Sequence, residues 1–202
     1  NGYARTIAAK SSGKKIPVTT ADWTLFAEKD LRLNGSHNFK NAVMASRIAQ
    51  SLGVPDTIIS KTVRMFKGLP HRLEIIRHQS GMTFVNDSAG TNPDTAAVAI
   101  RSFTGPLFLI CGGKDKGVSF EPLVRAVENT SNIKGIFLIG ENGPKILKFL
   151  GISKSKLSIS QYSDLRSAVR AAYLAAKKLT NLSTHQLPTI LFSPASASFD
   201  MF

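Results

Sequence analysis

The chain has 202 residues, 43% of them apolar, which is enough to bury a sizeable core in one domain or in a domain plus part of another. Its 26 Lys and Arg residues against 13 Asp and Glu residues give a formal net charge of +13. No segment approaches the roughly 20 apolar residues of a membrane-spanning helix, the N-terminus shows no secretory signal, and one cysteine excludes an internal disulfide or a cysteine-built zinc site.

The positive charge leaves two explanations open. A polyanionic partner such as nucleic acid is one, and a solubilising surface is the other. The basic residues are scattered and no aromatic residues alternate with them, so a binder of single-stranded nucleic acid is not favoured. A small anionic substrate fits this distribution at least as well.

Residues 1–36 are mostly polar, and Leu31 and Leu33 predict a short edge strand before Gly35. Apolar residues then recur at helical spacing and predict a helix that ends at Gly53; they are Phe39, Ala42, Ala45, Ile48, Ala49 and Leu52. A second helix is predicted from Pro55 to Gly68. Its inward residues would be Ile58, Ile59, Val63 and Phe66.

The segment 67–72, KGLPHR, is the predicted boundary, with one domain over 1–68 and a second over 69–202. After it, 73–78 and 82–87 flank QSG and predict a β-hairpin. Strands are then predicted at 107–111, 135–140, 157–160 and 189–193, and helices at 94–103, 120–130, 143–150 and 163–179. Apolar strands alternating with helices predict an α/β fold, Rossmann-like, with a mostly parallel sheet flanked by helices.

Three polar clusters follow predicted strands, where ligands bind in open α/β sheets. In NDSAGTNPD (86–94), Asp87 can accept hydrogen bonds from a ribose or order a cation, and the helix start after Asn92 favours an anion. The other interpretation is an Asx-turn with a helix cap. The third cluster, SPASAS, begins at Ser193.

GGKDKG (112–117) puts glycines and two lysines directly after a buried strand. Lys114 or Lys116 can bind a carboxylate or phosphate, and a solvated turn is the alternative. The segment does not match the nucleoside-triphosphate loop G-x-x-x-x-G-K-[ST], and no other part of the chain does.

Two further segments carry candidate nucleotide contacts. In NGSHNFKN (34–41), the amides of Asn38 and Asn41 beside His37 can read a purine edge, unless the segment only caps its helix. Arg72 can meet phosphates or form an interdomain ion pair. No metal-ligand spacing joins the four histidines, and no G-x-S-x-G elbow supports a hydrolase.

Taken in order, HNxxN, GLPHRLE, NDSxxTNPD, GGxDKG and SPASASFDMF resemble the ordered motifs of the Mur ligase family, from about residue 31 to 202. NDSAGTNPD resembles the D-glutamate-adding branch, since branches that add other residues carry an aspartate-tyrosine-x-histidine-x-proline sequence there. The resemblance implies a cytoplasmic, monomeric ATP-dependent amide ligase of cell-wall synthesis, with no nucleic-acid or membrane partner. Its substrates would be UDP-N-acetylmuramoyl-L-alanine and D-glutamate, and its cofactors ATP and Mg²⁺.

By the same resemblance, ATP would be bound by His37, Asn38, Asn41, Arg72 and Asp87, and the D-glutamate carboxylates by Thr91, Lys116 and Ser198. Residues 1–68 would be the end of an ATP-binding middle domain, and 69–202 an amino-acid-binding domain. The triphosphate loop and the Mg²⁺ ligands are expected upstream, so no catalytic residue is assigned here and the chain alone is expected to be inactive. One departure is Ala89, where the family usually has lysine; Lys114 is the nearby lysine that can compensate.

Three alternatives remain open on the sequence. The chain resembles, more weakly, other ligases of the same superfamily, such as folylpolyglutamate synthase. A basic nucleic-acid-binding module would explain the net charge of +13. A regulatory or scaffold domain without catalysis is the third alternative.

Overall fold

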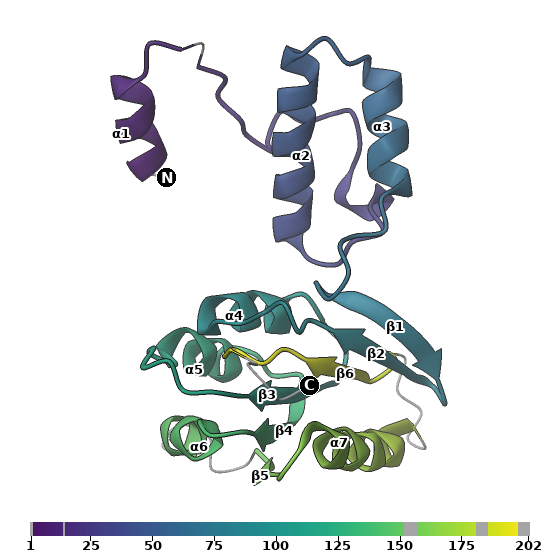
Figure 1. The fold of residues 1–202 in the computed structure, drawn as a ribbon. Coiled ribbons are helices and arrows are strands. Elements are labelled where there is room, and N and C mark those ends of the chain that lie inside the picture. Colours follow the sequence, from purple (N-terminus) through teal and green to yellow (C-terminus); the bar gives the residue numbers. More distant parts are fainter. Residues whose placement is uncertain (1, 14, 152–156, 181–185, 198–202) are drawn as a thin grey trace. The chain divides into compact units, whose positions relative to one another are not determined.

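A computed structural model describes residues 2–13, 15–151, 157–180 and 186–197 (Figure 1). The chain divides into two compact units. Unit 1 comprises Asn1–Arg32 and Ser36–Phe66, and unit 2 comprises Leu33–Gly35 and Lys67–Phe202. Within the described residues, no helix is long and apolar enough to cross a membrane.

Unit 1 is helical: α1 (Gly2–Lys10), the short 3-10 helix η1 (Glu28–Asp30), α2 (Ser36–Ser51) and α3 (Asp56–Met65). The structure confirms both helices predicted between residues 39 and 68. The edge strand predicted at Leu31–Leu33 is wrong, because the chain there leaves a helical turn. Asp30 accepts a hydrogen bond from the Ala27 N–H (2.9 Å) and pairs with Arg64 (3.0 Å), which holds this turn in place.

The core of unit 1 is small and partly aromatic. Phe26 is buried and lies edge-to-face with both Trp23 and Phe39. In α3 only Ile59 is buried; Ile58 and Phe66, predicted to point inward, are 55% and 45% exposed. The prediction is confirmed for Ile59, and Val63 is half-buried. It is wrong for Phe66 and for Ile58, which lies about 100° around the helix from Ile59.

Unit 2 is built on a six-stranded sheet in the order β1-β2-β6-β3-β4-β5. The strands are β1 (Glu74–Gln79), β2 (Met82–Asn86), β3 (Leu107–Gly112), β4 (Ile133–Ile139), β5 (Ile159–Gln161) and β6 (Thr189–Phe192). Among the strands of the described residues, β1 and β2 pair antiparallel, as the predicted hairpin, and the other strand pairs are parallel. The predicted α/β class with a mostly parallel sheet is confirmed.

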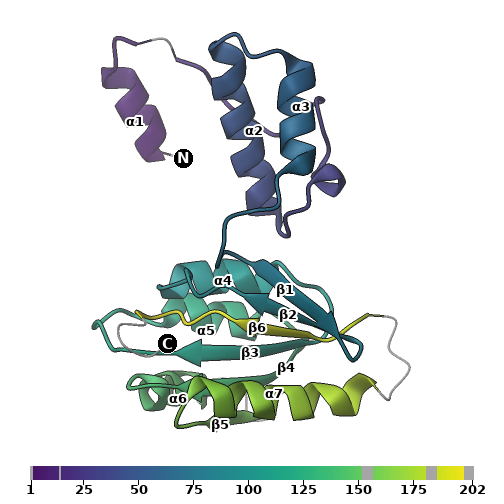
Figure 2. The same ribbon diagram turned by 45° about the vertical axis from the view of Figure 1, so that its right-hand side comes forward.

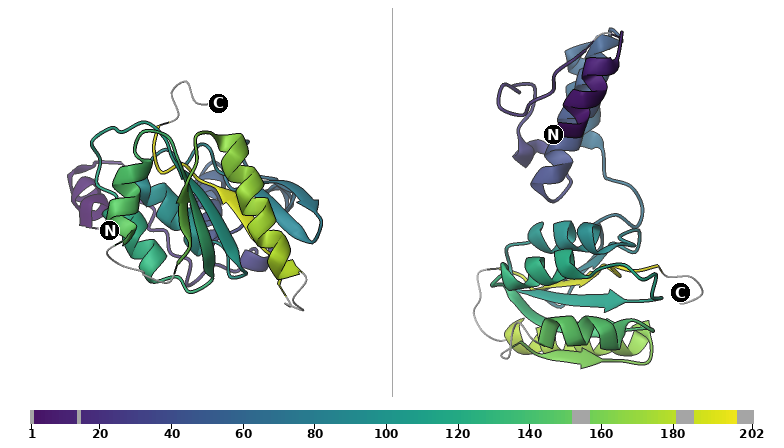
Figure 3. Two further views of the ribbon diagram at one scale, coloured as in Figure 1. Left: turned by 90° about the horizontal axis from the view of Figure 1, so that it is seen from below. Right: turned by 90° about the vertical axis from the view of Figure 1, so that its left-hand side faces the viewer.

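Helices cover both faces of this sheet (Figure 2). They are α4 (Pro93–Arg101), α5 (Glu121–Glu128), α6 (Gly143–Gly151) and α7 (Leu165–Thr180). Leu109 of β3 and Leu138 of β4 pack with α4, α5 and α6, whereas Ile110 and Ile139 pack with α7. Successive side chains of a strand point to opposite faces of the sheet, and helices cover both faces. The side chains of each central strand are therefore buried on both sides, which is why the strand sequences are largely apolar. Figure 3 (left) shows the strands between α7 and the opposite helical layer.

Parallel pairing of β2, β6, β3 and β4 brings the loops that follow these strands to one edge of the sheet, here called the carboxyl edge. Asn92 begins α4 there: its Oδ1 accepts from the Thr95 N–H (2.9 Å), and Pro93 occupies the first turn. The helix start predicted at Asn92-Pro93 is therefore confirmed, and so is its capping role.

Candidate functional site

Asp87 joins three segments at the carboxyl edge. Its side chain is 6% exposed, and its Oδ2 accepts from the Ser193 hydroxyl (2.7 Å). Its Oδ1 accepts from the Leu73 N–H (3.1 Å), on the segment before β1. A Cβ added at Gly90 would lie 2.4 Å from Asp87 Oδ2, so only glycine lets the loop turn this tightly around the carboxylate. Oδ2 thus joins the loop after β2 to the segment after β6, and Oδ1 joins it to the segment before β1. Contact with a ribose stays a prediction.

Arg72 is exposed on a backbone that is fixed on both sides. His71 and Leu73 both have positive φ values, 65° and 46°, a left-handed conformation that costs a non-glycine residue about 1–3 kcal/mol. His71 is held by the Ala89 N–H, which donates to its carbonyl oxygen (3.0 Å), and by the Asn86 amide, 2.9 Å from its Nδ1. These contacts sustain the strain and hold the backbone from which the Arg72 side chain extends at the edge.

The loop after β3 is anchored by Asp115. Lys145 of α6 pairs with its carboxylate (2.9 Å), and the Gly117 N–H donates to Oδ1 (2.9 Å). The Lys145 ammonium and the Gly117 N–H hold the pKa of the Asp115 carboxyl below its ordinary value. Lys116, the next residue of this loop, is exposed.

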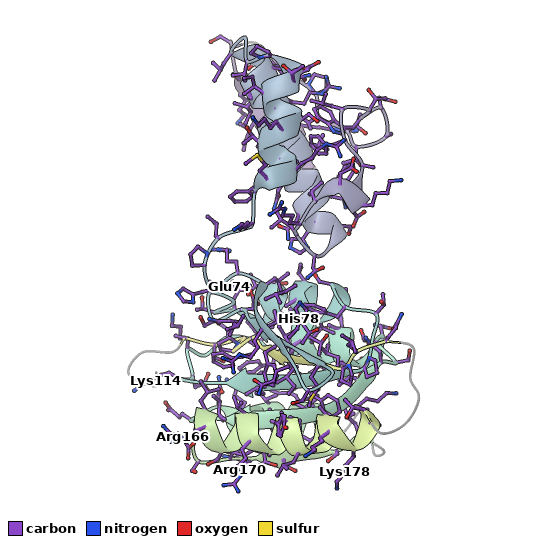
Figure 4. All side chains as sticks on the ribbon, turned by 90° about the vertical axis from the view of Figure 1, so that its right-hand side faces the viewer. Glu74, His78, Lys114, Arg166, Arg170 and Lys178 are labelled. Atoms are coloured by element: carbon purple, nitrogen blue, oxygen red, sulfur yellow. The ribbon has the colours of Figure 1, made fainter. Side chains whose placement is uncertain are left out.

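The loop after β3 also lies along the segment after β6. Lys114 forms an isolated antiparallel bridge with Ala197, and its N–H donates to the Ala197 carbonyl oxygen (2.9 Å). Ala195, at φ 57°, donates to the Gly90 carbonyl oxygen (2.9 Å) on the loop after β2. Figure 4 shows Lys114 at the carboxyl edge. Ser198, predicted to bind D-glutamate, lies outside the described residues.

The predicted site residues fall into two groups. Asp87, Thr91, Arg72 and Lys116 all lie at the carboxyl edge of unit 2, and Thr91 is exposed in the loop after β2. His37, Asn38 and Asn41 lie in the first two turns of α2 in unit 1. His37 and Asn38 are half-buried, and Asn41 is exposed. The five predicted ATP contacts are thus divided between the two units, and their roles stay predictions.

Asn142 is a residue of this edge that the sequence reasoning missed. It follows β4, is 1% exposed, and accepts from the Gly113 N–H at Oδ1 (2.8 Å) while its Nδ2 donates to the Ser196 hydroxyl. The signal was available, since GEN (140–142) follows a buried strand just as the three selected clusters do.

Among the residues that the structure describes, no three His, Cys, Asp or Glu side chains gather so as to hold a metal ion. We therefore assign no residue of this part of the chain to the implied Mg²⁺. The single cysteine, Cys111, is buried in β3, and burial raises the pKa of its thiol to about 12. Cys111 is therefore a packing residue of the core, and we assign it no role as a nucleophile.

Comparison with known proteins gives a family match over most of unit 2. Residues 71–181 match the family model described as "Mur ligase, glutamate ligase domain". UDP-N-acetylmuramoylalanine–D-glutamate ligase of Caldanaerobacter subterraneus is 38% identical over 175 residues, covering 86% of this chain and 37% of the relative. The ligase of the same name from Alkaliphilus oremlandii is 34% identical over 196 residues, covering 97% of this chain and 39% of the relative.

The chain thus spans little more than a third of the length of these curated relatives. Among solved structures, folylpolyglutamate synthase of Mycobacterium tuberculosis, complexed with ADP, superimposes with a TM-score of 0.63 at 18% identity. The superposition covers 82% of this chain and 39% of that one. At this identity the likeness concerns the fold alone.

Proposed function

The chain belongs to the Mur ligase family, and from that membership we propose that it is part of an ATP-dependent ligase that adds D-glutamate to UDP-N-acetylmuramoyl-L-alanine. The observation that carries the proposal is its 34–38% identity to ligases of that name over nearly the whole chain. The sequence NDSAGTNPD, which resembles the D-glutamate-adding branch, supports the same acceptor. Such an enzyme works in the cytoplasm in peptidoglycan synthesis.

We assign the acceptor site to the carboxyl edge of unit 2. D-Glutamate carries two carboxylates, which require cationic and hydrogen-bonding donors. Lys116 supplies an exposed ammonium, and Thr91 an exposed hydroxyl on the loop after β2. Ser198 is the third proposed donor. Asp115 is fixed to Lys145 (2.9 Å), so its negative charge is already compensated and does not repel the substrate.

We assign the ATP contacts to residues of both units. His37, Asn38 and Asn41 of α2 would meet the adenine, Arg72 the phosphates and Asp87 the ribose. The backbone on both sides of Arg72 is already fixed, so only its side chain has to be ordered when a phosphate binds. Residues 1–68 would then end an ATP-binding middle domain, and 69–202 would form the amino-acid-binding domain.

The reaction divides into two group transfers. The substrate carboxylate attacks the terminal phosphorus of ATP, which releases ADP and leaves an acyl phosphate. The neutral amine of D-glutamate then attacks the acyl carbon, inorganic phosphate leaves, and the amine loses a proton as the amide forms. In this reaction the chain holds D-glutamate by its carboxylates. The amine is then in place beside the acyl phosphate, which makes the second step effectively unimolecular. Mg²⁺ would stabilise the charge on the phosphates.

Ala89 sets this chain apart from its family, which usually has lysine there. Ala89 is half-buried, and its N–H donates to the His71 carbonyl oxygen (3.0 Å). Its backbone therefore supports the segment that carries Arg72, but its side chain brings no charge. We propose that Lys114, exposed on the neighbouring loop, supplies the missing positive charge.

The test is phosphate release by the full-length protein that contains this chain, with ATP, Mg²⁺, UDP-N-acetylmuramoyl-L-alanine and one amino acid. Release is expected with D-glutamate and not with L-glutamate, and the 202-residue chain alone is expected to stay at background. Equal release with L-glutamate, or none with D-glutamate, would contradict the proposal. Binding of random DNA at 150 mM salt that weakens steeply with added salt would instead favour the nucleic-acid module.

A further inference from the structure

We propose that Asn142 is a positioning residue for the D-glutamate site, because it holds the loop that carries Lys116 against the segment after β6; the inference rests on the proposed function. Gly113, which it contacts, lies three positions before Lys116, and Ser196, its other partner, lies two positions before Ser198. Lys116 and Ser198 come from loops after different strands. Asn142, on the loop after a third strand, bonds to both loops.

Three hydrogen bonds make the connection. The Gly113 N–H donates to Asn142 Oδ1 (2.8 Å), and the Asn142 N–H donates back to the Gly113 carbonyl oxygen (3.1 Å). Asn142 Nδ2 donates to the Ser196 hydroxyl. The residue is 1% exposed, so these bonds form away from bulk water, where an unpaired partner is costly. A buried amide with both ends bonded holds its neighbours in one arrangement.

The backbone around Asn142 has no room to adjust. A Cβ added at Gly140 would lie 2.8 Å from Gly113 Cα, and one added at Gly113 would lie 2.6 Å from the Ala197 carbonyl oxygen. The loops after β3, β4 and β6 therefore touch backbone to backbone here. This close approach places the Asn142 amide within reach of both partners.

Few other side chains fit this position. Alanine and leucine would leave the Gly113 N–H without its acceptor at a buried site, which is costly. Aspartate has the right shape, but it would bury a negative charge. The amide is the neutral group of this size that can accept at one end and donate at the other.

Loss of the amide is expected to loosen the site without removing any group that touches substrate. Misplacement of a binding group by about 1 Å can cost up to roughly 100-fold in rate. The effect should fall on D-glutamate and not on ATP, because the two loops that Asn142 joins, after β3 and after β6, contain no proposed ATP ligand.

Asn132 offers a matched control at the opposite edge of the sheet. It precedes β4, is half-buried, and its Nδ2 donates to the carbonyl oxygens of Phe103 (2.9 Å) and Gly105 (2.6 Å) before β3. Asn132→Ala thus also removes two side-chain hydrogen bonds that join neighbouring loops. It does so at the amino ends of the strands, away from the carboxyl edge.

The experiment compares Asn142→Ala and Asn132→Ala in the full-length protein by steady-state kinetics. Asn142→Ala is expected to raise the KM for D-glutamate about tenfold while the KM for ATP stays within about twofold. Asn132→Ala is expected to change neither constant, although both variants lower the unfolding temperature. Ser196→Ala, which keeps the Gly113 contact and is the milder change, is expected to raise the KM for D-glutamate by a smaller factor.

Hydrogen exchange provides a second measurement that does not need turnover. Asn142→Ala is expected to speed exchange in residues 112–117 and 193–197, and Asn132→Ala is not. The inference is overturned if both variants give the same KM for D-glutamate, if KM for ATP rises with it, or if exchange in these loops is unchanged. If Asn142→Ala does not fold, an unchanged KM in Ser196→Ala overturns it. If wild-type protein does not use D-glutamate, the proposed function fails, and exchange alone decides whether Asn142 joins the loops.

Discussion

Asp115 and Lys145 show how a charge pair can serve a loop without touching the substrate. Their side chains are about one-third exposed, and the pair joins the loop after β3 to α6. Lys145 Nζ also lies 5.7 Å from the ring centre of the buried Phe120, which restrains the ammonium from a second side. The pair fixes the loop in the conformation that displays Lys116.

Lys145→Met is expected to lower the unfolding temperature at neutral pH by removing the partner of Asp115. The pKa of Asp115 is lowered below its ordinary 3.8 in the folded protein. A lowered pKa contributes stability above the ordinary value, and that contribution disappears as the pH falls through the folded value. The difference between wild type and Lys145→Met, measured by thermal unfolding, should therefore shrink below pH 3.8.

Lys148→Met, on the same helix, is the control, since no ion pair is recorded for Lys148 among the described residues. It should show little pH dependence in this range. If Lys145→Met lowers the unfolding temperature by as much at pH 3 as at pH 7, Lys145 stabilises the loop by packing alone.

At the residue scale, the sequence predicts which loops carry chemistry but not which groups bond to one another. Asp87 was selected because it ends a strand, yet its partner Ser193 is 106 positions away. Asn142 and Ser196 are 54 positions apart. Such pairs form only when the parallel sheet brings the ends of its strands together. The local sequence around each residue does not predict which strand ends will be neighbours.

The element with the clearest link between sequence and packing is α7. Ala168, Ala172 and Ala176 recur every four residues, are fully buried, and face the sheet with Phe108 and Ile110 of β3. Asp164 starts the helix by accepting from the Ser167 N–H (2.8 Å), and that bond lowers the pKa of its carboxyl. Small side chains at this spacing let a single helix lie close to the sheet and cover one face of it.

Ala172→Leu is expected to destabilise unit 2 by about 1–3 kcal/mol, because three extra carbon atoms must enter a filled interface. Urea unfolding followed by far-UV circular dichroism measures the change. Leu174→Ala is the control on the same helix: Leu174 is 51% exposed, so its replacement should stay within about 0.5 kcal/mol. Equal midpoints for Ala172→Leu and wild type would mean that α7 can move away from the sheet at little cost.

At the element scale, long periodic segments were predictable and short ones were not. Every strand and helix that the structure describes after residue 73 was predicted, because apolar runs alternate with segments of helical spacing. The strand predicted at Leu31–Leu33 is wrong and α1 was not predicted. Two alternating leucines are too few to distinguish a strand from a turn, and the hydrogen bonds of Asp30 decided the outcome.

At the scale of the whole molecule, the outer face of α7 accounts for part of the net charge of +13. Arg166, Arg170 and Lys178 follow one another along this helix, as Figure 4 shows, and Lys177 is exposed beside them. No acidic residue occurs between Leu165 and Thr180. These cations lie on a solvated helix and not in the loops of the carboxyl edge, as the solubilising-surface interpretation predicts.

The central claim is that the carboxyl edge of unit 2 holds the amino-acid acceptor of the ligase. Lys116→Ala in the full-length protein tests it most directly, with KM measured separately for D-glutamate and ATP and with Lys178→Ala on α7 as the control. We expect the KM for D-glutamate to rise by about 10- to 100-fold, the KM for ATP to stay within about twofold, and Lys178→Ala to match wild type. An unchanged KM for D-glutamate in Lys116→Ala would contradict the claim.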